Sequence, residues 1–181
     1  RLIGLFFLIP LIYFYFSKKI RKKYINICFL IFFLIMLQGV IGWFMVESGL
    51  VNVTSVSHYR LSIHLSTAII IISSIYWLIM NTYSKKKKLF FKISLQNLPF
   101  QMLILLILFQ IIMGAFVSGL DAGNLYQTWP LMNDSYFPDD VKLIKYFDIF
   151  DFKNHSLVQF FHRNLAYIIF LLSILIGYKI F

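Results

Sequence analysis

Two histidines, His64 and His162, combine a residue type and a position that could do chemistry. The chain has four histidines, and the other two, His58 and His155, stand at the starts of apolar stretches, where we expect water to reach them. His64 and His162 come six or seven residues into these stretches, about 9–10 Å along a helix. Two ionisable rings at matching depth in an apolar helix bundle are costly, which makes them candidates for function.

Neutral imidazole is a common metal ligand, and a haem iron held between facing helices is a natural use for it. The spacing leaves open a second interpretation, in which each ring only hydrogen-bonds a neighbouring helix or loop. Arg60 shares a helix face with His64, and Arg163 follows His162 directly. Because guanidinium pairs well with carboxylates, both arginines could contact haem propionates. For Arg60, reaching towards lipid headgroups is the competing explanation.

Other chemistry finds little support. Glu47 is the only glutamate and ends an apolar stretch, where a solvated carboxylate is favoured over a proton acceptor. Cys28 is the only cysteine, which excludes an intrachain disulfide and any CxxC motif. Catalytic triads, phosphate-binding loops, HExxH and Cys/His zinc patterns are absent from the sequence.

Composition predicts an all-α integral membrane protein. The chain is 60% hydrophobic and 13% charged, with a mean hydropathy of +0.81, and long apolar runs satisfy their backbone hydrogen bonds as helices. The net charge of +10 would suggest nucleic-acid binding in a soluble protein. Here the basic residues lie between apolar runs, so membrane topology explains them and no nucleic-acid partner is expected.

Five apolar stretches predict an antiparallel transmembrane bundle. Ser57 and Ser156 are the expected N-caps of the third and fifth. The connecting segments 17–24 and 84–92 each carry five positive charges, which places them on the cytoplasmic or matrix side and the histidines on the outer side. The first stretch is short for a span. The expected spans are 2–16, 25–46, 60–83, 95–118 and 156–178.

A repeated pattern occurs at the outer ends of two predicted spans. Gln38-(x3)-Gly42 in the second span resembles Gln110-(x3)-Gly114 in the fourth, and a Ser-Gly-Leu follows each. We interpret this as a duplication in which the second span corresponds to the fourth and the first to the fifth. The alternative is that small residues at helix ends are common packing devices.

The long outer loop 119–155 is rich in glycine, proline, aspartate and aromatic residues. This composition predicts an ordered cap above His162 rather than a featureless linker. We hypothesise that Tyr126 and Trp129 help this cap to limit access of water to a haem beneath it.

Motifs along the whole chain closely resemble those of haem A synthases of the alphaproteobacterial and mitochondrial type. In the second half the matching motifs are GAFVSGLDAG (114–123), TWPLM (128–132), PDD (138–140) and VQFFHR (158–163). In the first half they are QGVIGWFMVESGL (38–50) and SHYRLSIHL (57–65).

The resemblance implies eight membrane helices in two pseudo-symmetric four-helix halves. Residues 1–92 would be the last three spans of the N-terminal half, and 93–181 the first two of the C-terminal half with loop 119–155. Each half of such an enzyme holds a pair of histidines. His64 would match the fourth-helix ligand of the half linked to substrate haem O. His162 would match the second-helix ligand of the half that binds haem b.

The implied activity is oxidation of a ring methyl of haem O to the formyl of haem A, through a hydroxymethyl intermediate, for cytochrome oxidase biogenesis. The expected catalytic glutamate would lie upstream of Arg1 and further helices beyond Phe181, so we expect this chain alone to be inactive. Implied partners are membrane lipid, haem O synthase, cytochrome oxidase assembly factors and a second copy of the chain. The implied location is the bacterial or mitochondrial inner membrane. The alternative is a b-type cytochrome that only transfers electrons; a transporter is disfavoured, because the histidines lie near one face.

Overall fold

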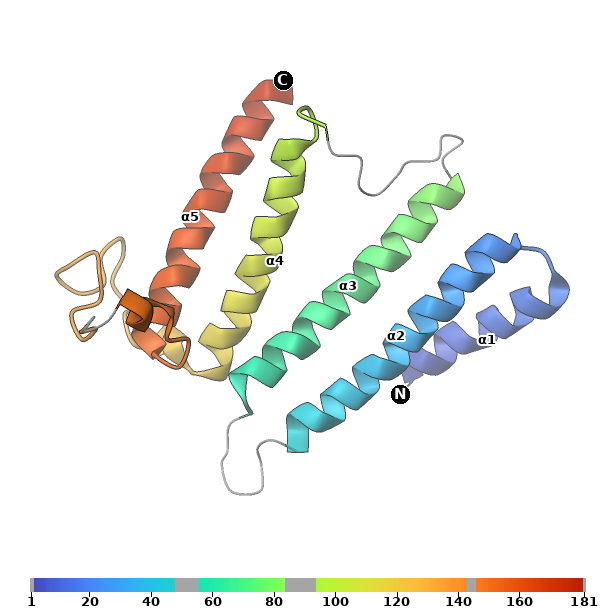
Figure 1. Ribbon diagram of the computed structural model, residues 1–181, viewed down its shortest axis with the longest axis horizontal. Coiled ribbons are helices and arrows are strands. Elements are labelled where there is room, and N and C mark those ends of the chain that lie inside the picture. The colour runs from blue at the N-terminus through green and yellow to red at the C-terminus, as the bar shows by residue number, and fades with distance from the viewer. Residues whose placement is uncertain (1, 48–55, 84–93, 143–145, 181) are drawn as a thin grey trace.

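The computed structural model describes residues 2–47, 56–83, 94–142 and 146–180, and this part of the chain is helical apart from loops and one isolated bridge between Met132 and Ser135. Neighbouring helices run in opposite directions (Figure 1). The predicted all-α membrane helix bundle is confirmed. The helices are α1 (Leu2–Ser17), α2 (Lys22–Glu47), α3 (His58–Tyr83), α4 (Leu98–Gly119) and α5 (His155–Ile180), with 3-10 turns η1 (Ala122–Asn124) and η2 (Tyr146–Phe150).

Four of the helices, α2 to α5, are long and apolar enough to cross a membrane. In the most apolar 18-residue stretch of each of these helices, only 6–17% of the residues are buried by other described residues. Most of the apolar side chains therefore face outwards, as they would towards lipid. α1 has 16 residues and contains Pro10, which is shorter than the roughly 20 residues that a span needs. The protein is therefore a multi-pass membrane protein.

The helix boundaries differ from the predicted spans by a few residues. α2 begins at Lys22 and α5 continues to Ile180, because backbone hydrogen bonding does not stop where the apolar run stops. α4 begins at Leu98 instead of Leu95, with Asn97 at its N-cap position but without a side-chain capping hydrogen bond. Pro99 sits in the first turn, where a missing N–H leaves no helical hydrogen bond unmade.

The cap of α5 corrects the prediction for Ser156. Asn154 Oδ1 accepts hydrogen bonds from the backbone N–H groups of Ser156 (3.0 Å) and Leu157 (3.1 Å), so Asn154 is the N-cap and Ser156 lies inside the helix. At α3 the carbonyl of Ser57 accepts from the amide of Leu61 at 3.0 Å, which puts Ser57 at the predicted cap position.

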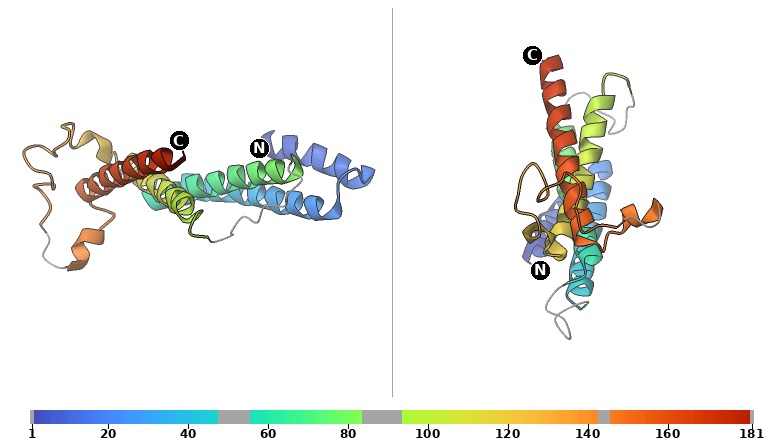
Figure 2. Two further views of the ribbon diagram at one scale, coloured as in Figure 1. Left: turned by 90° about the horizontal axis from the view of Figure 1, so that it is seen from above. Right: turned by 90° about the vertical axis from the view of Figure 1, so that its left-hand side faces the viewer.

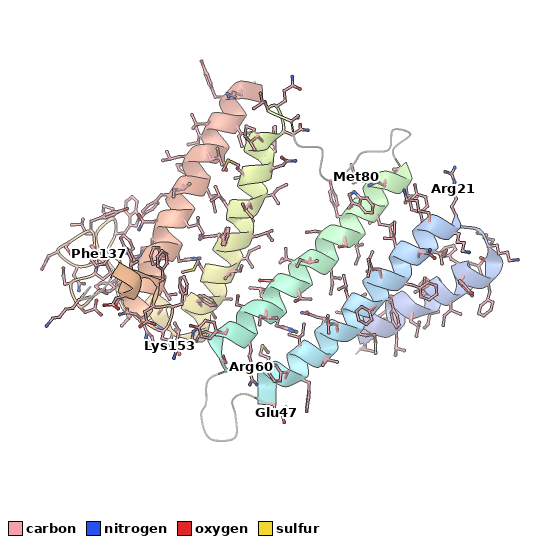
Figure 3. The ribbon with its side chains drawn as sticks, in the orientation of Figure 1. Arg21, Glu47, Arg60, Met80, Phe137 and Lys153 are labelled. Atoms are coloured by element: carbon pink, nitrogen blue, oxygen red, sulfur yellow. The ribbon has the colours of Figure 1, made fainter. Side chains whose placement is uncertain are left out.

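All the histidines lie towards one end of the row of helices. Figure 1 shows the end of α2, the start of α3, the end of α4 and the start of α5 on one side. Figure 3 labels Glu47 and Arg60 there, and Arg21 and Met80 at the opposite end. Seen from above, α2 to α5 follow one another in an open row (Figure 2), with contacts between consecutive helices.

Helices α3 and α4 approach most closely where His58 meets Gly119. A Cβ at Gly119 would lie 2.8 Å from both Cα and Cβ of His58, so only glycine fits. The His58 ring packs edge-on against Phe116 with centroids 5.4 Å apart, and its Nε2 is buried without a partner. The expectation that water reaches His58 holds only in part, because the helix crossing covers its Nε2 and leaves the residue half-buried, whereas His155 is exposed as expected.

Candidate functional site

His64 lies half-buried on α3 against a glutamine and a glycine of α2. Gln38 Nε2 donates a hydrogen bond to the backbone carbonyl of His64 at 2.8 Å and lies 3.4 Å from the ring Nε2. A Cβ at Gly42 would come within 3.0 Å of the ring Cε1. The ring Nδ1 is buried and has no hydrogen-bond partner, so one nitrogen of this imidazole is left unsatisfied.

His162 has the same surroundings on α5, supplied by α4. Gln110 Nε2 lies 3.3 Å from His162 Nε2, and a Cβ at Gly114 would come within 3.3 Å of Cε1. This ring too is half-buried, and its Nδ1 is buried without a partner. In both places the oxygen of the glutamine amide is also buried and unpartnered.

The two arrangements share one register. Gln38 and Gln110 each lie nine residues before the end of their helix, and His64 and His162 lie six and seven residues after the start of theirs. The imidazoles therefore sit at matching depth, as the sequence predicted. The local equivalence joins the pair α2–α3 to the pair α4–α5. The match of the first span with the fifth stays a prediction, because α1 contains neither the glutamine nor the histidine by which the other pairs correspond.

Arg60 links the start of α3 to the end of α2. Its Nη1 donates to the carbonyl of Phe44 at 2.8 Å, and the guanidinium carbon lies 3.7 Å from the centre of the Phe44 ring. Figure 3 labels Arg60 and Glu47 at this same end of the row of helices. The guanidinium thus neutralises the carbonyl end of a helix, where positive charge is favourable.

Arg163 and Gln159, one turn apart on α5, hold the first part of the long loop. Arg163 donates to the carbonyls of Thr128 (2.8 Å) and Leu131 (3.4 Å) and to that of Tyr126. Gln159 is 4% exposed; its oxygen accepts from the Tyr126 amide at 3.2 Å and its nitrogen donates to the Tyr126 carbonyl at 3.0 Å. The loop is therefore fixed to the helix turn that carries His162.

Asp140 fixes a later part of the same loop. Its two carboxylate oxygens accept from the hydroxyls of Tyr126 (2.5 Å) and Ser156 (2.7 Å). Burial raises the pKa of Asp140, but the two hydroxyl hydrogen bonds outweigh it and hold that pKa below its usual value. Burial and the bond to Asp140 raise the pKa of Tyr126.

The described part of loop 119–155 is thus ordered around α5. Tyr126 is 6% exposed, but Trp129 is 74% exposed, so of the two aromatic residues in the capping hypothesis only Tyr126 is built into the packing. Sequence reasoning missed Gln159 and Asp140. The sequence did contain a signal for Gln159. It is a polar residue in an apolar helix, four positions before Arg163 and on the same face, which indicates that the two side chains act together.

The chain matches the cytochrome oxidase assembly protein family over residues 1–181. It belongs to this family. Similar proteins include the haem A synthases of Pelagibacter ubique (44% identical, covering 100% of this chain and 53% of the relative), Wolbachia pipientis wMel (41%, 99% and 51%) and Flavobacterium psychrophilum (38%, 99% and 53%). The chain spans about half the length of these relatives. No solved structure matches the chain.

Each helix pair offers one imidazole that could serve as a ligand to a haem iron. His64 and His162 each offer a half-buried imidazole with one unpartnered ring nitrogen and a glycine beside the ring. Among the described residues no group of three or more His, Cys, Asp or Glu side chains could hold a metal ion. A pocket at the start of α5 is lined by neither His64 nor His162. Its lining residues are Leu125, Asp140, Asn154, His155 and Ser156.

Proposed function

We propose that the protein works as a haem A synthase, which oxidises a ring methyl of haem O to the formyl group of haem A for cytochrome oxidase. Membership of the cytochrome oxidase assembly protein family and relatives named haem A synthase support this. The observation that carries the proposal is the pair of imidazoles at matching depth in equivalent surroundings. Oxidation of an unactivated methyl is chemistry that a bound haem iron supplies and that amino-acid side chains do not.

In this proposal His64 holds the substrate haem O and His162 holds a haem b. Arg60 and Arg163 are the candidate contacts for propionates, although both guanidinium groups already bond backbone carbonyls. The proposal includes the division into halves at residues 92 and 93. It also puts the histidine-bearing ends on the outer side of a bacterial or mitochondrial inner membrane. Of the basic loops behind this orientation, 84–92 lies outside the described residues.

Haem O synthase and cytochrome oxidase assembly factors are the partners that this activity needs, because one supplies the substrate and the others use the product. An open row of apolar helices suits a substrate with a long apolar tail, since such a tail can remain in lipid while the macrocycle is bound.

The test is pigment extraction from membranes that make haem O and contain the native full-length gene product. We expect haem A to accumulate, His162→Ala to lose the low-spin haem b spectrum, and His64→Ala to lose conversion while keeping that spectrum. His155→Ala is the matched control, because His155 is exposed at the start of α5.

Bound haem b without any conversion would instead identify an electron-transferring cytochrome and overturn the proposal. If the His64 and His162 variants both keep full haem content and full conversion, the ligand assignments are wrong.

A further inference from the structure

The glutamines beside the two histidines are unusual for membrane helices. Burying an amide in an apolar bundle is unfavourable unless its hydrogen bonds are made. Gln38 and Gln110 nevertheless occur at the same register, and each amide oxygen is buried without a partner. Each amide nitrogen faces the imidazole of the next helix. The ring contact is thus the feature common to both positions.

The geometry at Gln38 fixes the direction of its amide. The nitrogen, and not the oxygen, must face α3, because it donates to the His64 carbonyl at 2.8 Å. Its second N–H then faces the ring Nε2, 3.4 Å away. An N–H can only pair with a ring nitrogen that carries no proton, so the proton of neutral His64 belongs on Nδ1.

The glycine four residues later makes room for the ring. A methyl group at Gly42 would press on Cε1 of His64 at 3.0 Å, and one at Gly114 on Cε1 of His162 at 3.3 Å. By contrast, Gly39 has nothing within 4 Å of its Cβ position. A larger residue at Gly42 or Gly114 would therefore crowd the histidine ring in particular.

We propose that Gln38 with Gly42, and Gln110 with Gly114, form two equivalent imidazole seats whose residues position the rings of His64 and His162 and keep their protons on Nδ1. The Nε2 lone pair then accepts the amide N–H, so each seat fixes the ring while no metal is bound, and the amide has to turn away before Nε2 can bind a metal. Partners that orient a ligand histidine commonly change metal affinity by about 10–100-fold when removed. Gly42 and Gly114 can act in this way by leaving room for the ring, whereas the amides contact the ligand nitrogen itself. The role in haem binding depends on the proposed function, but the seat itself does not.

The first test needs no haem. The native full-length product is labelled with 15N-histidine in cells that cannot make haem, and ring-nitrogen shifts report the tautomer. We expect Nδ1–H for His64 and His162, and loss of that preference for His64 in Gln38→Met and for His162 in Gln110→Met. Methionine keeps the side-chain length and removes the amide. Gln101→Met, on the same helix as Gln110, is the control and leaves both rings unchanged.

The second test titrates haem b into the same protein. We expect Gly114→Ala to weaken binding at His162 by about 10-fold and Gly39→Ala to leave it unchanged. Nε2–H rings in the unsubstituted protein, or equal effects of the seat and control substitutions, would overturn the proposal. Tautomers that respond as expected in a protein that binds no haem would support the seats and refute the proposed function. Haem binding that requires His162 but is unchanged by Gly114→Ala would support the proposed function and refute a role of the seats in haem binding.

Discussion

Replacing Arg163 by methionine should release the first part of the long loop from α5. Methionine keeps most of the apolar length of the side chain and removes the donors that reach the carbonyls of Thr128, Leu131 and Tyr126. The loop should then open locally while α5 stays helical, because these bonds join the loop to the helix and none lies within the helix.

The three bonds do not count equally. The contact to Leu131 is long, at 3.4 Å, and contributes little. The Tyr126 carbonyl keeps a second donor, Gln159 Nε2 at 3.0 Å, so it is not left unpaired. The main loss is the 2.8 Å bond to Thr128. A hydrogen bond from a charged group contributes about 1.5–3 kcal/mol, and partial exposure favours the lower end, so the expected loss is about 2 kcal/mol.

Hydrogen exchange measured by mass spectrometry in detergent checks this value. The informative amides are those of Asn133, which donates to Thr128 Oγ1 at 2.8 Å, and Met132, which donates to the Ser135 carbonyl at 2.7 Å. A loss of about 2 kcal/mol predicts exchange about 30-fold faster at these amides. Arg60→Met is the control, because its bond goes to α2 and not to the loop.

Unchanged protection in Arg163→Met, or an equal change in Arg60→Met, would refute the anchoring role. The same variant also separates anchoring from the propionate hypothesis. If Arg163 mainly serves a propionate, Arg163→Met should shift the spectrum of the haem-loaded protein and leave loop exchange in the haem-free protein unchanged.

Two further predictions concern the loop and the helix crossing. Because the pKa of folded Asp140 is lowered, its carboxylate stabilises the loop above the unfolded pKa of about 3.9 and loses this effect as pH falls through the folded pKa. Loop exchange should therefore accelerate in strong acid, and Asp140→Asn should remove that dependence. Gly119→Ala should destabilise the α3–α4 crossing by about 1–3 kcal/mol, since the methyl would meet the backbone of His58 at 2.8 Å. Denaturation by SDS should show a lower midpoint for this variant than for Gly177→Ala, where the added methyl group has nothing within 4 Å.

Hydropathy and charge were sufficient to predict the fold class, because each span must satisfy its own backbone hydrogen bonds in lipid. The spans were predicted to within a few residues, and the depth of His64 and His162 followed from counting along the helices. Capping by Asn154 was missed, since serine and asparagine are almost equally good N-caps and only the backbone geometry decides between them.

The partners of the histidines were not predictable in the same way. Gln38 and Gly42 stood out as a repeat, but the repeat alone does not say which helix they face. The contact with His64 depends on α2 and α3 being neighbours in the membrane and on the rotation of both helices. The contacts of Arg163 were missed for a related reason. They go to backbone carbonyls of a loop, and the direction of a loop carbonyl cannot be predicted from sequence patterns.

The shared register has a consequence for the long loop. A short connection joins α2 to α3 and a long one joins α4 to α5, yet the two glutamine–histidine pairs meet at the same depth. The depth of each imidazole is therefore set by contacts between the helices and does not depend on loop length. Loop 119–155 is not what brings His162 to its position, and its anchoring through Gln159, Arg163 and Asp140 fixes the loop itself against the start of α5. Loosening the loop should accordingly leave the tautomer of His162 unchanged, whereas Gln110→Met should change it.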